Sequence, residues 1–234
     1  MKKLILSAAA AALLSASLAG VSSAAAPTIV NGSFETGTSP GSFLQLSSGD
    51  GTSIPGWTVI AGTVDYIGTY WPAADGVRSL DLNGSGAGAV RQSFATTVGT
   101  TYRVTFSMSG NPAGGAGTKT LTADTGGAPT IFTYEVGTLN PPTLTDMKWA
   151  TKSFSFTATA ATTTLTFTST TIGLVYGPAL DKVRVELATV KPLADCKNGD
   201  WRQLRDGQGR LFKNQGDCVS YFATKFRNSG AGAP

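Results

Sequence analysis

Alternation of apolar and polar residues with a period of two is the feature that most restricts the fold of this 234-residue chain. Residues 102–108 place Tyr, Val, Phe and Met at every second position, and shorter stretches around Phe154, Leu165 and Val183 repeat the pattern. Successive side chains of a β-strand point to opposite faces, so these stretches predict half-buried antiparallel strands. Glycine and proline separate them, and no stretch before Lys191 has a helical period. The sequence therefore predicts an all-β sandwich.

The first 25 residues have the pattern of a secretory signal peptide. Lys2 and Lys3 precede an apolar run at residues 4–18, and small residues follow at positions 22–26. The apolar run is shorter than the ~20 residues that a membrane-spanning helix needs. We therefore expect cleavage after Ala24 or Ala25, a secreted protein that can associate with a cell wall, and no membrane contact after cleavage.

The remaining chain divides into a large domain and a small tail. We expect residues 27–190 to form the sandwich, residues 191–228 to form a small module, and residues 229–234 to be disordered. The two cysteines of the chain, Cys196 and Cys218, both lie in the tail, and in an exported protein they are expected to form one disulfide. The apolar residues of the tail are too few for an independent core, so this disulfide is expected to hold it together.

Charge is distributed unequally between the two parts. Residues 27–190 carry eight Lys and Arg against ten Asp and Glu, whereas residues 191–234 carry eight against four. The basic tail is compatible with contact to an anionic polymer, such as a wall polysaccharide or teichoic acid, although an ordinary solvated surface is the preferred explanation of this charge. No nucleic-acid partner is expected, because aromatic and basic residues do not interleave in a binding motif.

Two acidic residues lie in motifs that open and close the large domain. In a jelly-roll sandwich the first and last strands lie close together, so Glu35 and Asp181 can converge on one cation. We predict a structural Ca²⁺ held by these two carboxylates and by oxygens near Asn31. The alternative is that the carboxylates cap turns or pair with the neighbouring bases Lys182 or Arg184.

A short segment in the first half of the domain combines aromatic and polar residues. Sugar recognition needs a flat aromatic face and a few polar groups for the hydroxyls. Gly68 and Pro72 favour a loop in this segment. The candidate ligand-binding residues are Tyr66, Tyr70, Trp71, Asp75 and Arg78. The alternative is that Tyr66 and Trp71 fill the core beneath the loop, which is also the expected position of Trp57.

The residue inventory argues against catalysis. The chain has no histidine, so a Ser-His-Asp or Cys-His arrangement is excluded. A pair of carboxylates could in principle hydrolyse a glycosidic bond, and Asp65, Asp75 and Asp81 are close in sequence. Asp81 is better explained as an outward-facing strand residue or as an acceptor that supports a turn. We expect no enzymatic activity.

Six motifs occur in a fixed order along the large domain: Asn31-Gly-Ser-Phe-Glu35, Ile54-Pro-Gly-Trp57, Val64-Asp-Tyr-Ile-Gly68, Trp71, Asp75-Gly-Val-Arg-Ser-Leu-Asp-Leu82 and Tyr176-Gly-Pro-Ala-Leu-Asp181. This set resembles the choice-of-anchor C family of bacterial surface proteins, which is related to the plant cell-wall family known as domain of unknown function 642. The resemblance covers about residues 28–187. It implies a galactose-binding-like jelly roll that is exported, non-catalytic and associated with polysaccharide.

The expected function is therefore a secreted carbohydrate-binding module that associates with cell-wall or extracellular polysaccharide. A structural or adhesive surface protein that binds another protein is the alternative from a different class. A weak carbohydrate-active enzyme is a third. The sequence leaves the glycan and the oligomeric state open.

Overall fold

The computed structural model describes residues 27–173, 175–188, 194–197, 200–202, 204 and 211–223. The predicted signal peptide, the predicted disordered end and the predicted domain boundary at residue 190 all lie outside these residues. Within them, no helix combines the length and apolar character needed to cross a membrane.

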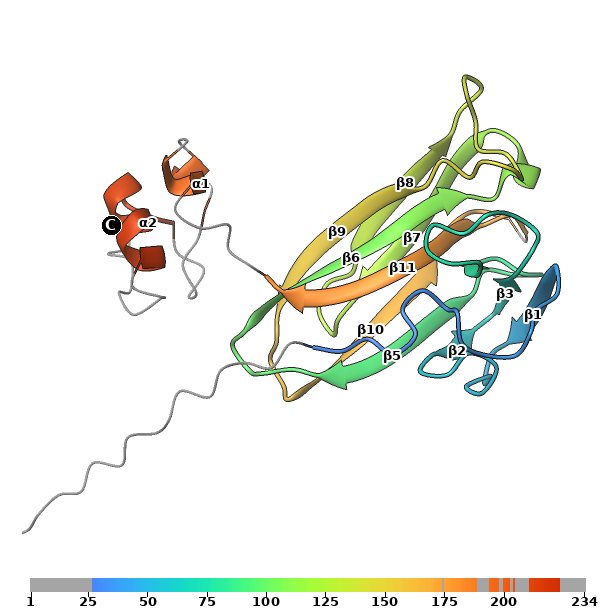
Figure 1. Ribbon diagram of the computed structural model, residues 1–234, viewed down its shortest axis with the longest axis horizontal. Coiled ribbons are helices and arrows are strands. Elements are labelled where there is room, and N and C mark those ends of the chain that lie inside the picture. The colour runs from blue at the N-terminus through green and yellow to red at the C-terminus, as the bar shows by residue number, and fades with distance from the viewer. Residues whose placement is uncertain are drawn as a thin grey trace, which may run out of the picture.

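The large domain is a sandwich of two antiparallel sheets, as Figure 1 shows. One sheet has the strand order β1-β3-β4-β11-β6-β9 and the other has the order β2-β5-β10-β7-β8. The strands are β1 (Phe43–Ser47), β2 (Thr58–Ala61), β3 (Thr63–Ile67), β4 (Ser79–Asp81), β5 (Ala89–Ala95), β6 (Thr101–Gly110), β7 (Gly117–Asp124), β8 (Thr130–Val136), β9 (Ala150–Thr157), β10 (Thr162–Ser169) and β11 (Pro178–Leu187). A 3₁₀ turn, Pro112–Gly114, connects β6 to β7. The prediction of an all-β jelly-roll sandwich is confirmed.

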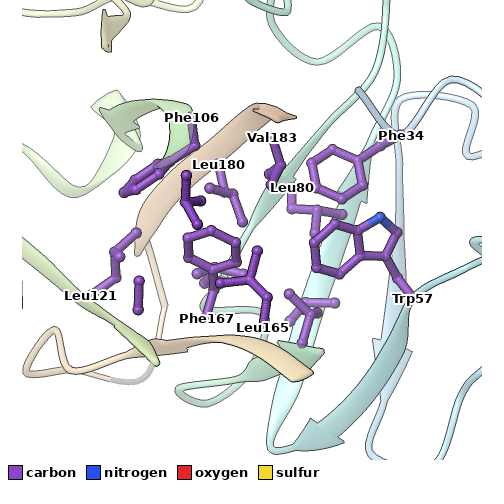
Figure 2. Packing of buried hydrophobic residues seen from close by; sticks show 14 of the residues in the cluster. Phe34, Trp57, Leu80, Phe106, Leu121, Leu165, Phe167, Leu180 and Val183 are labelled. Carbon is purple, nitrogen blue, oxygen red and sulfur yellow. The ribbon is translucent and has the colours of Figure 1, made fainter. Parts of the chain in front are cut away.

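The core lies between the two sheets and follows the period of two in the strands. The alternating residues of β6, from Tyr102 to Met108, are buried in it, as the pattern predicted. Figure 2 shows Phe106 and Phe167 packed among the aliphatic side chains, with Trp57 beside Phe34. Trp57 is 2% exposed and its indole N–H donates to the Asn31 carbonyl at 3.1 Å, so its predicted core position is also confirmed.

The opening and closing motifs of the domain lie against each other. The Val183 N–H of β11 donates to the Gly32 carbonyl at 2.8 Å, and a Cβ on Gly32 would lie 2.1 Å from the Val183 carbonyl oxygen. Only glycine permits so close an approach of the two backbones. The expectation that the two ends of the domain meet is therefore correct.

The described part of the tail contains α1 (Ala194–Lys197), a 3₁₀ turn (Asp200–Arg202) and α2 (Gln215–Ala223). Cys196 and Cys218 form the predicted disulfide, and both are fully buried. Phe212 and Tyr221 complete the small buried cluster around it. Partly buried apolar side chains pack against this cluster, namely Trp201, Leu204, Val219 and Phe222.

Reduction of the disulfide is expected to unfold the tail and leave the sandwich folded. The bond links residues 22 positions apart, and closing a loop of this length contributes on the order of 3 kcal/mol. Thermal melting followed by near-ultraviolet circular dichroism, with and without reductant, measures this effect. We expect the main transition, which is the unfolding of the sandwich, to have the same midpoint in both conditions. A lower midpoint for the main transition after reduction would show that the tail is an integral part of the sandwich.

Candidate functional site

The predicted ligand loop, residues 68–78, connects β3 to β4 and covers the outer face of the six-stranded sheet. Leu80 of β4 and Leu180 of β11 belong to the core, so their neighbours in each strand point to the opposite face. On that face the indole N–H of Trp71 donates to Ser79 Oγ at 2.8 Å, and the ring packs against Ala179. The loop therefore lies on the sheet as a covering layer.

Two carboxylates hold this loop by accepting backbone N–H groups. Asp181 Oδ2 accepts from Ala74 at 2.7 Å and from Asp75 at 2.9 Å. Glu35 Oε1 accepts from Val77 at 2.9 Å and from Arg78 at 2.8 Å. The two carboxylates thus converge, as predicted. In the structure they converge on the backbone N–H groups of the loop, whereas the prediction was a Ca²⁺ ion.

This arrangement agrees with the alternative interpretation, that the carboxylates support turns. Asn31 has a similar role, because its side chain accepts from the Thr36 N–H at 2.9 Å and donates to the Thr36 carbonyl at 2.7 Å. The described residues contain no group of three or more His, Cys, Asp or Glu side chains that could hold a metal ion. The oxygens of Glu35 and Asp181 that accept these amides fit a hydrogen-bonded clamp better than a calcium shell. Calcium binding stays a prediction.

Glycine at position 76 is required by the clamp. A Cβ there would lie 2.3 Å from Glu35 Cδ, and the residue has a left-handed φ of +77°. Glu35 therefore reaches the amides of the loop only because residue 76 has no side chain.

We expect Gly76→Ala to lower the free energy of unfolding by about 1–3 kcal/mol, because a left-handed non-glycine residue is strained and Glu35 must move. Gly86→Ala is the matched control, because no atom lies within 4 Å of a Cβ at that position. Urea unfolding of both variants measures the difference. Equal stability of the two variants would contradict the requirement for glycine at position 76.

The polar residues predicted to bind ligand are engaged within the protein. Asp75 Oδ2 accepts from Ser33 Oγ at 2.9 Å and forms an ion pair with Arg184 Nη2 at 3.0 Å, and these contacts lower the pKa of Asp75. Arg78 Nη1 donates to the Tyr66 hydroxyl at 2.7 Å and to the Gly37 carbonyl at 3.2 Å. Both side chains thus connect the loop to the first turn of the domain.

Tyr66 and Trp71 occupy the alternative position, in the core beneath the loop, and neither presents a ring face on which a sugar could stack. Tyr66 is fully buried in the main core, where its hydroxyl donates to the Phe34 carbonyl. Trp71 is 3% exposed and is enclosed by residues from distant parts of the chain, including Met147 and Ala179. Of the three predicted aromatic residues, Tyr70 remains half-buried and accessible.

Two hollows flank the covering loop. The larger has a volume of about 630 Å³ and includes one aromatic side chain, the nearly buried Trp71. All of its other lining residues are non-aromatic, namely Ser39, Pro40, Gly41, Gly68, Thr69, Pro72, Ala73, Gly76, Val77, Arg78, Leu144 and Thr145. This hollow therefore lacks an exposed ring on which a sugar could stack.

The smaller hollow, about 230 Å³, has three accessible aromatic side chains. They are Phe43 of β1, which is 50% exposed, Tyr70 of the loop, and Tyr176, which is 41% exposed. The Phe43 and Tyr70 rings meet edge to face, with their centroids 5.6 Å apart. We call these three residues the aromatic trio.

The sequence analysis missed Phe43 and Tyr176. Leu46 of β1 is a core residue and Leu44 packs against the core, so Phe43 lies with Gln45 on the outer face, where an aromatic residue is conspicuous. Tyr176 precedes β11 in a left-handed conformation with φ of +62°, which is rare for a bulky residue and is enriched at functional sites. For Phe43, an aromatic residue on the polar face of a strand is a signal that the sequence contains. The position of Tyr176 beside the hollow is known only from the folded chain.

Beneath the smaller hollow lies a fully buried carboxylate, Asp81. Its oxygens accept from the backbone of Asn83 at 2.8 Å, from the backbone of Gly177 at 3.0 Å and from Asn111 Nδ2 at 2.7 Å. Burial raises the pKa of Asp81 to about 7 despite these hydrogen bonds, and the nearby Asp65 carboxylate adds to the increase. Asp81 is therefore a hydrogen-bond acceptor that supports turns, which is one of the two roles expected for it. Its side chain faces away from the core between the sheets, but the residues that donate to it bury it completely.

Comparison with known structures finds carbohydrate-binding modules of similar fold. The CBM22-1 xylan-binding domain from Paenibacillus barcinonensis Xyn10C is 21% identical, with a TM-score of 0.39, over 62% of this chain and 92% of that domain. CBM35 from Paenibacillus barcinonensis is 18% identical, with a TM-score of 0.40, over 62% of this chain and 99% of the module. A family 35 carbohydrate-binding module from Clostridium thermocellum is 10% identical, with a TM-score of 0.38, over 70% of this chain and all of the module.

Comparison with curated sequences finds halomucin from Haloquadratum walsbyi, strain DSM 16790 / HBSQ001. It is 39% identical over 98 residues, which cover 39% of this chain but 1% of halomucin. The chain thus matches only a very small part of that protein. The family described as "Protein of unknown function (DUF642)" matches residues 27–186, which include every strand of the sandwich except the last residue of β11. The chain belongs to this family, Protein of unknown function (DUF642).

Proposed function

We propose that this protein is an exported, non-catalytic module that binds cell-wall or extracellular polysaccharide through the aromatic trio. The observation that carries the proposal is the convergence of Phe43, Tyr70 and Tyr176 around one hollow. Polar side chains also line this hollow, namely Gln45, Asp65, Asn83, Ser85 and Asn111. Sugar rings stack their C–H faces on aromatic side chains, while nearby polar groups bind the hydroxyls. The carbohydrate-binding modules of similar fold are consistent with this function but do not locate the site.

The size of the hollow agrees with a small contact. Its volume of about 230 Å³ is below the roughly 300–1,000 Å³ of a pocket for a drug-sized ligand. One sugar ring of a longer chain is therefore the unit we expect it to hold. Such a contact is weak for a single ring, and association with a polymer would gain from repeated ligand units.

Export is supported by two independent features. The N-terminal residues have the composition of a signal peptide, and the tail contains a disulfide, which persists in oxidising compartments. The basic tail is a candidate for a second contact with an anionic wall polymer.

Removal of two rings of the aromatic trio should weaken polysaccharide binding without unfolding the protein. A stacked ring contributes on the order of 1 kcal/mol, or about fivefold in affinity, so Phe43→Ala and Tyr176→Ala together should reduce binding more than tenfold. Affinity electrophoresis in gels that contain soluble polysaccharide measures the change. Ile131→Ala, which removes an exposed apolar side chain of β8 outside the hollow, should leave binding unchanged.

Thermal melting of the same variants separates binding from folding. Both rings are about half exposed, so we expect their removal to change the melting temperature little. Binding that survives the double substitution would contradict the proposed site. Absence of binding to every polysaccharide by the wild-type protein would instead favour a protein partner.

A further inference from the structure

The hydrogen-bond donors at the base of the smaller hollow are already used by the protein. Asp81 accepts from the Asn83 N–H, the Gly177 N–H and Asn111 Nδ2, which all belong to residues at or beside the hollow. The side-chain amide of Asn83 donates to the Gly173 carbonyl at 3.3 Å. These donors point to the protein and away from a ligand.

The hydrogen-bond acceptors at the hollow have fewer partners within the protein than the donors have. Asn83 is 1% exposed, and its Oδ1 is a buried oxygen for which the described residues provide no hydrogen-bond partner. Buried polar atoms are normally paired, so an unpaired one needs an explanation. Asp65 Oδ1 accepts a long hydrogen bond of 3.4 Å from Gln45 Nε2. Asn83 Oδ1 lies against the Gly177 backbone, where a ligand does not reach it, whereas Asp65 lines the hollow and can accept from a ligand that donates hydrogen bonds.

The charge of the hollow has one sign. Its lining residues contain one carboxylate, Asp65, and no Lys or Arg, and the Asp81 carboxylate lies directly beneath. Burial raises the pKa of Asp65, which shows that this environment already disfavours negative charge. A bound carboxylate or sulfate would meet the Asp65 carboxylate and no Lys or Arg among the lining residues, and an unpaired charge is costly to remove from water.

We propose that this hollow selects a neutral sugar residue that donates a hydroxyl hydrogen to the Asp65 carboxylate, and that it excludes acidic sugars. The selection rests on the proposed function, because it specifies the substrate class of the same site. The aromatic trio provides affinity for any sugar ring, and the Asp65 carboxylate decides which ring is retained.

The first test compares polysaccharides on the full mature protein. Affinity electrophoresis with a neutral galactan and with polygalacturonate should show retardation by the galactan that Phe43→Ala weakens about fivefold. Retardation by polygalacturonate through the basic tail would persist in Phe43→Ala and would decrease with salt. Retardation by polygalacturonate that is as strong as that by galactan and is weakened to the same extent in Phe43→Ala would overturn the proposal.

The second test replaces the carboxylate by an amide of the same shape. Asp65→Asn should weaken binding to the galactan by several-fold, because a charge-assisted hydrogen bond becomes a neutral one. It should also reduce the preference for neutral over acidic polysaccharide. Glu186→Gln removes one negative charge from an exposed position of β11 and is the matched control.

The two proposals fail in different ways. Weakened galactan binding in Phe43→Ala together with unchanged binding and selectivity in Asp65→Asn would overturn the selection and leave the carbohydrate site in place. Absence of binding to both polymers by the wild-type protein would overturn both proposals. The comparison of the two polymers on wild-type protein requires no variant at Asp65, so it remains decisive if that variant does not fold.

Discussion

Trp71→Ala is expected to lower the free energy of unfolding by about 3–5 kcal/mol, the range for truncating a buried tryptophan. The ring is 3% exposed, packs against Met147 and Ala179, and donates a buried hydrogen bond to Ser79. Its removal would leave a cavity between the covering loop and the sheet and would leave the Ser79 hydroxyl without this donor. An accessible stacking residue would instead affect binding and hardly affect stability.

Urea unfolding of Trp71→Ala beside Trp57→Ala measures this effect, because Trp57 is a core tryptophan with 2% exposure. Tyr70→Ala is the contrasting variant, since its half-buried side chain should cost clearly less. A Trp71→Ala variant as stable as wild type but unable to bind polysaccharide would restore the sequence-based assignment of Trp71 to the ligand surface.

Stability should decrease as the pH rises from about 4 to about 7. Burial raises the pKa of Asp81 from 3.8 to about 7 in the folded chain, so between these values the folded protein holds a proton that the unfolded chain has released. The contribution of Asp81 to the free energy of unfolding then decreases with increasing pH until about pH 7 and is constant above that pH. About three pKa units, at about 1.4 kcal/mol each, correspond to roughly 4 kcal/mol.

Other carboxylates also contribute to the pH dependence of stability. Burial raises the pKa of Asp181 to about 7 and also raises that of Asp65, so both add to the decrease between pH 4 and 7. Asp75 has a lowered pKa because of its hydrogen bond from Ser33 and its contact with Arg184, and its contribution is lost when the pH falls below about 4. Maximal stability is therefore expected in mildly acidic solution.

Asp81→Asn isolates the part of this pH dependence that Asp81 contributes. The amide oxygen can still accept from Asn83 and Gly177, whereas the contact with Asn111 Nδ2 is lost, at a cost of about 1 kcal/mol. We expect the wild type to be more stable at pH 4.5 and the variant to be more stable at pH 8, as measured by urea unfolding. A constant difference between the two proteins across this range would show that Asp81 does not titrate there.

Local patterns in the sequence were sufficient for the strands and for the family. Alternation in residues 102–108 predicts one buried face, and β6 buries that face, because the period of side chains along a strand is a property of the backbone. The disulfide follows in the same way from two cysteines in one short segment, and the sequence also predicts the buried position of Trp57. These features depend on neighbours in sequence or on general rules of burial.

The candidate site depended on contacts between distant segments. A period of two tells which residues leave the core face of a strand, but it does not tell whether the other face meets water or a covering loop. The loop around Trp71 covers it, because Glu35 and Asp181 from the two ends of the domain bind the amides of residues 74–78. The same folding brings Phe43 and Tyr176 together beside Tyr70. The sequence therefore determined which side chains can bind a sugar, and the tertiary structure decided which of them remain accessible, since burial is set by what packs over a residue.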